Sequence, residues 1–353
     1  MRTRPSGRRT LAIIAFLLAL VVVSLGAWVR LSDAGLGCPD WPGCYGKLVG
    51  VPEHAHEKSA AEAAFGQRVE AGKAWKEMIH RYAAGTLGLC IAGLAVLGWR
   101  QRATRRPTLE LALLGVVVLQ ATLGMLTVTQ LLKPVIVTSH LLGGMTTLAL
   151  LAALVLRDGR GFRPATNTNI GLQAHAIAAL ATVVIQIALG GWVSSNYAAA
   201  ICPDFPSCQG SFSPALDFHH AFTLDRELGI TASGTLLPAS ALTAIHWTHR
   251  LFAGVVLLVV GSLGLRLLAH RHSRGSGLAL LGALGLQIGL GIANVLLQLP
   301  LPLAVAHNTG AALLLCVTLA TARSLLNKEK ARHRQPAAGF PRRFNELNTE
   351  SAR

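Results

Sequence analysis

Long apolar runs, each about the length of a membrane-spanning helix, alternate with polar connections along most of the chain. About 20 apolar residues in an α-helix cross the ~30 Å hydrocarbon core of a bilayer. The runs lie near residues 11–29, 78–99, 109–129, 135–156, 171–193, 241–269, 278–298 and 303–325. The pattern therefore predicts an all-α fold, a polytopic membrane protein with eight transmembrane helices.

Basic residues gather in every second connection, which orients the predicted spans. The clustered residues are Arg2, Arg4, Arg8 and Arg9; Arg100, Arg102, Arg105 and Arg106; Arg157, Arg160 and Arg163; Arg271 and Arg274; and Lys328, Lys330, Arg332 and Arg334. Because cytoplasmic loops carry an excess of Lys and Arg, these connections and both termini are predicted to be cytoplasmic. The long connections 30–76 and 194–238 then face the periplasm of a bacterial inner membrane. The first apolar run ends in Trp28-Val29-Arg30 without a small-residue cleavage site, which favours a retained helix over a signal peptide.

The composition agrees with a membrane protein and argues against a nucleic-acid partner. The 353 residues are 52% hydrophobic and 14% charged, against roughly 25% charged in soluble domains. A formal net charge of +16 is compatible with nucleic-acid binding, but aromatic residues make up only 5% of the chain and offer no stacking platform. Membrane lipid is the expected surrounding, and no nucleic acid is expected.

The motifs of the first half recur in the second half at similar intervals. The segment Cys38–Cys44 begins ten residues after Trp28, and Cys202–Cys208 begins ten residues after Trp192. The other matched pairs are His80-Arg81 with His249-Arg250, Gln120 with Gln287, Gly124 with Gly291, and His140 with His307. The recurrence indicates an internal duplication.

The duplication predicts two tandem pseudo-symmetric four-helix bundles, related as a parallel repeat because each half crosses the membrane an even number of times. The predicted domains are a cytoplasmic N-terminus (1–10), an N-terminal bundle (11–156), a cytoplasmic linker (157–170), a C-terminal bundle (171–325) and a basic cytoplasmic tail (326–353).

Each predicted bundle carries one histidine on its second span and one on its fourth, near the non-cytoplasmic face. The pairs are His80 with His140 and His249 with His307. Opposed neutral imidazoles in a helix bundle are typical axial ligands of heme iron, so one bis-histidine heme site is predicted in each half. Zinc is less favoured, because carboxylate and thiolate ligands do not recur at matching positions. Glycines near the histidines are expected to leave room for the flat macrocycle: Gly85, Gly254, Gly143 and Gly310.

The residues next to two of the histidines suggest different roles for the halves. Arg81 and Arg250 are candidate partners for heme propionates, or interfacial side chains that reach toward water. Three residues before the histidine stands Glu77 in the first half and His246 in the second. Glu77 is a candidate catalytic carboxylate, or an interfacial residue in water. His246 is interpreted as a supporting group beside the ligand rather than a ligand itself. The difference suggests that the N-terminal bundle reacts and the C-terminal bundle stores electrons.

The loop cysteines allow two interpretations. Disulfides Cys38–Cys44 and Cys202–Cys208 would close the loops over the two sites in an oxidising compartment. Alternatively, the pairs would take part in thiol–disulfide exchange or in a transient substrate contact. Cys90 and Cys316 lie in apolar runs and are interpreted as small hydrophobic residues.

Taken together, the Glu-x-x-His-Arg motif at Glu77–Arg81, the duplicated bundle, the four histidines and the paired loop cysteines resemble the heme A synthase family, in its bacterial type with paired loop cysteines. The resemblance covers about residues 10–325. It implies a membrane-bound heme-dependent oxidoreductase that converts heme O to heme A for terminal oxidase assembly, by oxidising the C8 methyl of the porphyrin to a formyl group. The longer outer loops and the basic tail depart from compact members of the family.

The resemblance also implies roles, cofactors and partners. His249 and His307 would hold a heme b cofactor, His80 and His140 the substrate heme O, and Glu77 would act in catalysis. Molecular oxygen and an external electron donor are implied as reactants. A heme O synthase (a farnesyltransferase) as substrate donor, terminal oxidase assembly factors and further copies of the chain in a homo-oligomer are the expected partners.

Three other functions fit parts of the pattern. A diheme membrane cytochrome could pass electrons from quinol through the same histidines, but it gives Glu77 no task. A membrane thiol oxidase would use the loop cysteine pairs and needs them to cycle. A heme carrier or structural oxidase subunit would bind heme without turnover.

Overall fold

The computed structural model describes residues 7–158 and 170–326, and its regular elements in those ranges are all helical. The long helices are α1 (Gly7–Leu31), α3 (Ala71–Arg100), α4 (Thr108–Thr129), α5 (Pro134–Asp158), α6 (Ile170–Ser195), α8 (Ala239–Leu268), α9 (Arg274–Leu296) and α10 (Leu301–Leu326). The short ones are α2 (Ala55–Phe65), η1 (Ala198–Ala200) and α7 (Phe218–Ala221). Within the described ranges, eight helices are long and apolar enough to cross a membrane, which confirms the predicted all-α class and the eight spans. The predicted linker 157–170 and tail 326–353 fall almost entirely outside the described residues, as does much of the predicted segment 1–10.

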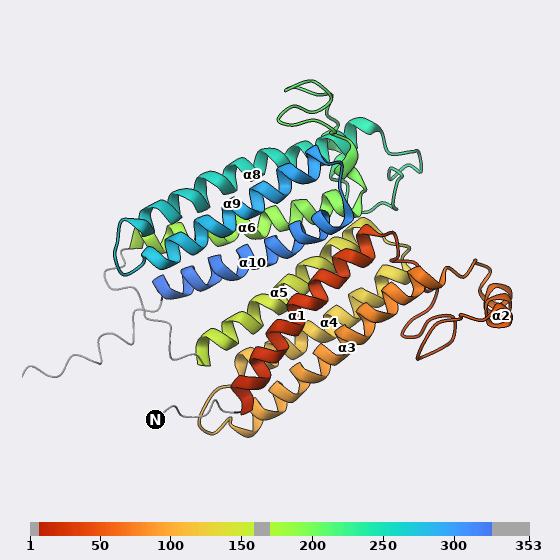
Figure 1. The fold of residues 1–353 in the computed structure, drawn as a ribbon, viewed down its shortest axis with the longest axis horizontal. Coiled ribbons are helices and arrows are strands. Elements are labelled where there is room, and N and C mark those ends of the chain that lie inside the picture. Colours follow the sequence, from red (N-terminus) through yellow and green to blue (C-terminus); the bar gives the residue numbers. More distant parts are fainter. Residues whose placement is uncertain (1–6, 159–169, 327–353) are drawn as a thin grey trace, which may run out of the picture.

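The spanning helices pack as two sets of four, as Figure 1 shows. In the first set, α3 and α5 each pack against both α1 and α4; in the second, α8 and α10 each pack against both α6 and α9. The sets meet where α1 and α5 contact α10 and where α5 contacts α6. Along α1, Ala12, Ala15 and Ala19 are fully buried, because small side chains let membrane helices approach closely.

Polar contacts near the middle and at one end join the two sets. The hydroxyl groups of Ser24 on α1 and Thr309 on α10 lie 2.8 Å apart. At the end of α1, the Arg30 guanidinium donates to the Ser194 carbonyl at 2.5 Å and stacks 3.8 Å from the centre of the Tyr197 ring. Because these contacts are few among many apolar ones, the sets are held together mainly by packing of α1, α5, α6 and α10.

The two tight turns between spans have the same backbone shape. Between α4 and α5, Leu131 and Leu132 have φ values of 46° and 58°; between α9 and α10, Gln298 and Leu299 have φ values of 56° and 60°. Two successive non-glycine residues with positive φ are uncommon, so their recurrence supports the internal duplication. Both long connections emerge at this same end of the helices (Figure 1).

At the opposite end, three helices of the first set meet at a buried carboxylate. Glu110 on α4 is 1% exposed, and its Oε1 accepts from Arg8 of α1 and from Arg157 of α5, each at 2.5 Å. Gly98 of α3 leaves room for it, because a Cβ there would lie 3.1 Å from the Glu110 Cγ. At the matching position of the second half stands Gly277, where a Cβ would collide with the backbone of α8. Glu110 stands at the start of the predicted apolar run 109–129, where an acidic residue in the first turn of a helix is common and gives no signal of burial.

Replacing Glu110 by alanine is expected to destabilise the first set strongly. Loss of one partner of a buried ion pair costs about 3–5 kcal/mol, because the remaining charge stays in a medium of low polarity. Unfolding of the purified protein in detergent, followed by circular dichroism, measures the change. Asp225→Asn is the control: Asp225 is 95% exposed and pairs with Lys133, so its loss should cost at most about 1 kcal/mol. Equal stability of Glu110→Ala and wild type would show that the cluster contributes little.

Candidate functional site

The four predicted ligand histidines occupy matching places in the two sets. His80 is on α3 and His140 on α5; His249 is on α8 and His307 on α10. In each set the two histidines stand on helices of the same set of four. Each of the four histidines is half-buried. The structure thus brings together the two pairs that the sequence predicted.

A glycine on a neighbouring helix contacts each imidazole at its Cε1 edge. A Cβ on Gly26 of α1 would lie 3.0 Å from the His80 Cε1, and one on Gly190 of α6 would lie 3.1 Å from the His249 Cε1. A Cβ on Gly124 of α4 would lie 3.4 Å from the His140 Cε1 on the next helix. A Cβ on Gly291 of α9 would lie 3.0 Å from the His307 Cε1. A Cβ at Gly26, Gly190 or Gly291 would make the imidazole shift by a few tenths of an ångström, whereas one at Gly124 would be in ordinary van der Waals contact with its ring.

The four glycines that were expected to make room for the macrocycle, Gly85, Gly143, Gly254 and Gly310, do not contact the imidazoles. A Cβ on Gly143 or Gly310 would collide with the side-chain amide of Gln120 or Gln287, so these glycines make room for glutamines rather than for a macrocycle. Gly85 and Gly254 follow their histidines by five residues, about 140° around the helix, and nothing lies within 4 Å of a Cβ there. The expectation was therefore wrong for Gly143 and Gly310, and for Gly85 and Gly254 it stays a prediction. Helical spacing alone does not reveal which neighbouring helix approaches a side chain.

Three glutamine amides lie beside the histidines. Gln186 Nε2 is 3.2 Å from the His249 Nδ1 and 3.1 Å from its carbonyl oxygen. Gln287 Nε2 is 3.3 Å from the His307 Nδ1, and Gln120 donates to the His140 carbonyl at 2.9 Å. In the described part of the chain, the Oε1 atoms of all three amides are buried without a hydrogen-bond partner.

Glu77 and His246 each connect the first turns of a histidine-bearing helix to the preceding loop. Glu77 accepts a hydrogen bond from a backbone N–H group, whereas His246 contacts a backbone carbonyl group. Glu77 is 5% exposed; its Oε2 accepts from the Cys38 N–H at 2.9 Å and its Oε1 accepts from Arg81 at 2.5 Å. His246 Nδ1 lies 3.0 Å from the Ala198 carbonyl, and its Nε2 accepts from Arg250 at 3.1 Å. A neutral imidazole protonated on Nδ1 satisfies both contacts. Glu77 is thus buried under the loop, and not in open water at an interface.

Arg81 and Arg250 hold the cysteine loops through backbone carbonyl groups. Arg81 donates to the carbonyls of Asp40, Pro42 and Gly43. Arg250 donates at 2.8 Å to the carbonyls of three loop residues: Cys202, Asp204 and Ser207. The side chains point at the loops, which neither sequence interpretation of these arginines anticipated. Charged hydrogen bonds to carbonyls are among the stronger contacts that position a loop.

The two cysteine loops, 38–44 and 202–208, are closed by the same kinds of bonds. The cysteines pair as Cys38–Cys44 and Cys202–Cys208, which favours the disulfide interpretation of the loops. In the second loop, Asp204 accepts from the backbone N–H groups of Gln209 and Gly210. Hydrogen bonds from the Ser207 hydroxyl and from these N–H groups lower the pKa of the Asp204 carboxyl to about 2. Asp40 accepts from the matching N–H groups of the first loop.

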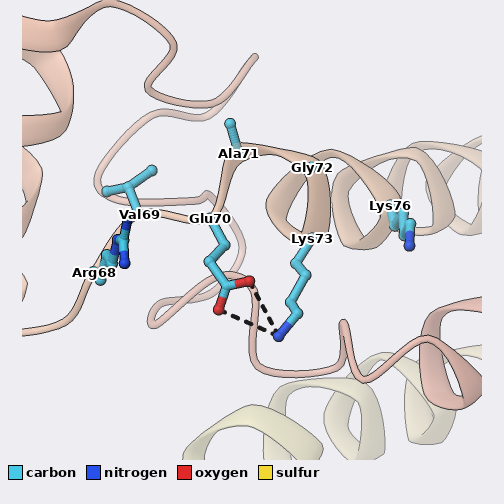
Figure 2. A pocket seen from close by; sticks show the side chains of 7 residues that line it. All are labelled: Arg68, Val69, Glu70, Ala71, Gly72, Lys73 and Lys76. Carbon is cyan, nitrogen blue, oxygen red and sulfur yellow. Dashed lines mark hydrogen bonds and ion pairs between the residues drawn. The ribbon is translucent and has the colours of Figure 1, made fainter.

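A hollow at the start of α3 lies beside the first cysteine loop (Figure 2). Its lining residues are Arg68, Val69, Glu70, Ala71, Gly72, Lys73 and Lys76. Lys73 pairs with Glu70 at 3.2 Å, and the Lys76 ammonium lies 5.3 Å from the centre of the Trp28 ring. None of the four site histidines lines this hollow, so it is separate from the space next to the imidazoles.

Comparison with known proteins identifies the family. A model of the COX15-CtaA family, described as cytochrome oxidase assembly protein, matches residues 9–319. The chain belongs to the COX15-CtaA family. A protein of Shewanella oneidensis named heme A synthase is 42% identical over 310 residues, covering 87% of this chain and 93% of that protein. Heme A synthases of Caulobacter vibrioides and Halalkalibacterium halodurans are 29% and 27% identical, covering 91% and 66% of this chain and 96% and 74% of those proteins.

The COX15-CtaA match spans both halves, so the matched segment contains all four site histidines and both cysteine loops. The sequence motifs found the histidines, Glu77, His246, the arginines and the cysteine pairs. They missed Gly26, Gly190 and Gln186. Gly26 and Gly190 each stand two residues before a tryptophan that opens the repeated motif, a signal that could have found them.

Removing the Arg250 side chain is expected to release the second loop of this COX15-CtaA protein. A charged hydrogen bond is worth about 1.5–3 kcal/mol, so amide exchange in 202–208 should accelerate at least tenfold in Arg250→Ala. Hydrogen–deuterium exchange with mass spectrometry measures it, and segment 38–44 in the same sample is the internal control. Arg81→Ala should show the reverse pattern. Equal protection of both loops in both variants would contradict the assignment.

Proposed function

We propose that this protein is a heme A synthase, which converts heme O to heme A by oxidising the C8 methyl of the porphyrin to a formyl group. The observation that carries the proposal is the pair of imidazoles within each set of four helices, each imidazole set against a glycine. The family membership and the names of the relatives support the same activity.

The residues fit a flat iron porphyrin in each half. Two imidazoles are the donor set of a six-coordinate heme iron. The described residues contain no group of three or more His, Cys, Asp or Glu side chains placed for a metal ion. Two-imidazole ligation by heme does not need such a group, but a zinc site does.

The two halves would divide the work. His249 and His307 would hold heme b, which supplies or accepts electrons when bound. His80 and His140 would hold the substrate heme O near Glu77. The Glu77 carboxylate, fixed by the Cys38 N–H and Arg81, would accept a proton or stabilise positive charge next to the reacting methyl group. Arg81 and Arg250 would have to break their hydrogen bonds to loop carbonyl groups in order to bind heme propionates. We therefore propose that their main role is to position the loops.

Further parts of the proposal come from the chemistry. Oxidation of a methyl group needs an oxidant and electrons, so molecular oxygen and an external donor are proposed reactants. A heme O synthase is the proposed supplier of substrate, and terminal oxidase assembly factors are proposed to receive the product. We also propose a homo-oligomer in the bacterial inner membrane, with both termini cytoplasmic and both cysteine loops periplasmic.

Replacing His249 or His307 by alanine is expected to abolish the low-spin heme that co-purifies with the protein, because a single imidazole cannot form the six-coordinate site. Pyridine hemochrome analysis and the optical spectrum measure the loss. His175→Ala is the matched control: His175 lies on α6 of the same half and contacts the Val259 carbonyl, so this variant should keep its heme. Full heme content in both His249→Ala and His307→Ala would refute the site.

Glu77→Gln is expected to retain heme but to lower conversion of heme O to heme A at least about a hundredfold, the usual contribution of a positioned acid or base. Membranes supplied with heme O, followed by mass analysis of extracted hemes, measure product. Arg81→Ala separates catalysis from loop anchoring, because it releases the same loop without removing the carboxylate. Equal activity of the two variants would remove Glu77 from the chemistry. A wild-type protein that makes no hydroxylated or formyl heme would favour an electron-transferring diheme cytochrome.

A further inference from the structure

Both cysteine loops expose large apolar side chains at matching positions. Trp41 and Phe205 stand three residues after the first cysteine of their loop, and Leu48 and Phe212 stand four residues after the second. The exposed fractions match as well, at 41% and 43% for the first pair and 72% for both members of the second. We call these four side chains the apolar loop residues. Single exposed apolar side chains are common on proteins, but a recurring set indicates a surface that an apolar partner or medium covers.

A pair of backbone hydrogen bonds closes each loop just before its more exposed apolar residue. Cys44 and Lys47 exchange N–H to carbonyl contacts of 2.8 and 3.1 Å, and Cys208 and Ser211 exchange contacts of 2.9 and 3.1 Å. The disulfides close the same segments. The side chain that follows such a closed turn moves inward only if these bonds break, so the loops present their apolar residues outward.

The loops lie beside the spanning helices rather than beyond their ends. Arg81, which donates to the first loop, stands ten residues after the start of α3, and Arg250, which donates to the second, stands eleven residues after the start of α8. At a rise of 1.5 Å per residue, both positions are about 15 Å along their helices. Both also fall inside the predicted apolar runs 78–99 and 241–269. The arginines therefore hold the loops alongside the membrane-spanning part of these helices.

A tyrosine on the outer side of α3 joins the first loop at the same level. The Gly50 N–H donates to the Tyr82 hydroxyl at 2.9 Å, and Val49, the residue before Gly50, is 81% exposed. Tyr82 shares an exposed face of α3 with Ile79 and Leu89. Tyrosine is enriched where a spanning helix meets the boundary between membrane and water. The exposed apolar surface of the first loop is therefore continuous with the lipid-facing surface of α3.

The second loop adjoins a comparable face of α8. Arg250, which holds this loop, is followed by Leu251, and the side chains of Leu251, Val255 and Leu258 are exposed. Residues three and four apart lie on one face of a helix. Leu251 also has the place on α8 that Tyr82 has on α3, two residues after the site histidine. Each loop therefore extends an apolar face of a spanning helix.

We propose that both cysteine loops insert their apolar loop residues into the adjoining leaflet of the bilayer, beside α3 and α8, where lipid acyl chains cover them. Arg81 and Arg250 hold the loops from the protein side, and lipid holds them from the opposite side. The loops are then part of the membrane-embedded surface rather than segments surrounded by water. The proposal needs no bound heme, so it goes beyond the proposed function and does not depend on it.

Quenching of a fluorescent label at single loop positions tests the proposal. The full-length chain carries Leu48→Cys or Phe212→Cys together with Cys90→Ala and Cys316→Ala, and mass spectrometry of unreduced peptides confirms that both loop disulfides remain. The new thiol is labelled with bimane, and the protein is placed at one copy per phosphatidylcholine nanodisc. The control is Ala60→Cys on α2, an exposed position on a helix that lies beyond the end of α3 (Figure 1).

Two quenchers distinguish lipid from water around the label. Phosphatidylcholine with a nitroxide on acyl carbon 5 quenches a label that contacts lipid, and iodide quenches a label that contacts water. The ratio of lipid quenching to iodide quenching should be at least fivefold higher at positions 48 and 212 than at position 60. Ratios equal to that of the control would overturn the proposal. Protection from both quenchers would also overturn it, because protein rather than lipid would then cover the loops.

Amide exchange in nanodiscs tests, without any label, whether lipid stabilises the loops. Leu48→Asp and Phe212→Asp place a carboxylate where acyl chains are expected, which is costly in a membrane. Exchange should therefore accelerate at least threefold in 38–44 or in 202–208 respectively, while Leu48→Phe, the residue type of the second loop, and Ala60→Asp should match wild type. Unchanged exchange in both aspartate variants would overturn the stabilising role of lipid. A protein that gives these results but makes no heme A would refute the proposed function alone.

Discussion

The close contact between each site imidazole and a glycine on the neighbouring helix is the constraint on which the site depends. At Gly26, Gly190 and Gly291 a Cβ would come within about 3.1 Å of an imidazole carbon, tighter than ordinary van der Waals contact. Because glycine has no side chain, the imidazole packs directly against the backbone of the neighbouring helix. Because spanning helices are rigid over this length, a ring packed against this backbone keeps its place without a bound ligand, and both sets of four helices use the same device.

The internal duplication repeats these helix contacts in both halves, and the halves differ at a few matching positions. Where one half has Glu77, an acceptor for a backbone N–H, the other has His246 beside a backbone carbonyl. Where one half has the buried carboxylate Glu110, the other has Gly277 in close helix contact. These differences leave the helix packing intact, because each keeps its local hydrogen bonds or close packing satisfied. Matching positions of the two halves can therefore carry different polar groups within the same fold.

The sequence predicted the eight spans, the internal repeat and the histidine pairs, because apolar length and motif spacing are local properties of the chain. It did not predict contacts that depend on which helices become neighbours. Gly143 sits three residues after His140, yet it makes room for Gln120 of another helix. Arg81 and Arg250 follow their histidines in sequence, yet their guanidinium groups meet loop carbonyls about forty residues earlier. Helical periodicity predicts on which face of a helix a residue lies. Which residues contact that face depends on tertiary packing, which the local sequence does not determine.

The two ends of the N-terminal set are held by opposite means, and this bears on where motion can occur. At the end away from the loops, Glu110 joins α1, α4 and α5 through a buried ion cluster, which resists separation because parted charges would stay desolvated. At the loop end, Arg81 and Glu77 hold Cys38 and its neighbours through hydrogen bonds to backbone groups. Such bonds are individually weaker and exchange with water more readily. The end that holds the ion cluster is therefore expected to be the more rigid of the two, and the loop end the one where local opening costs less.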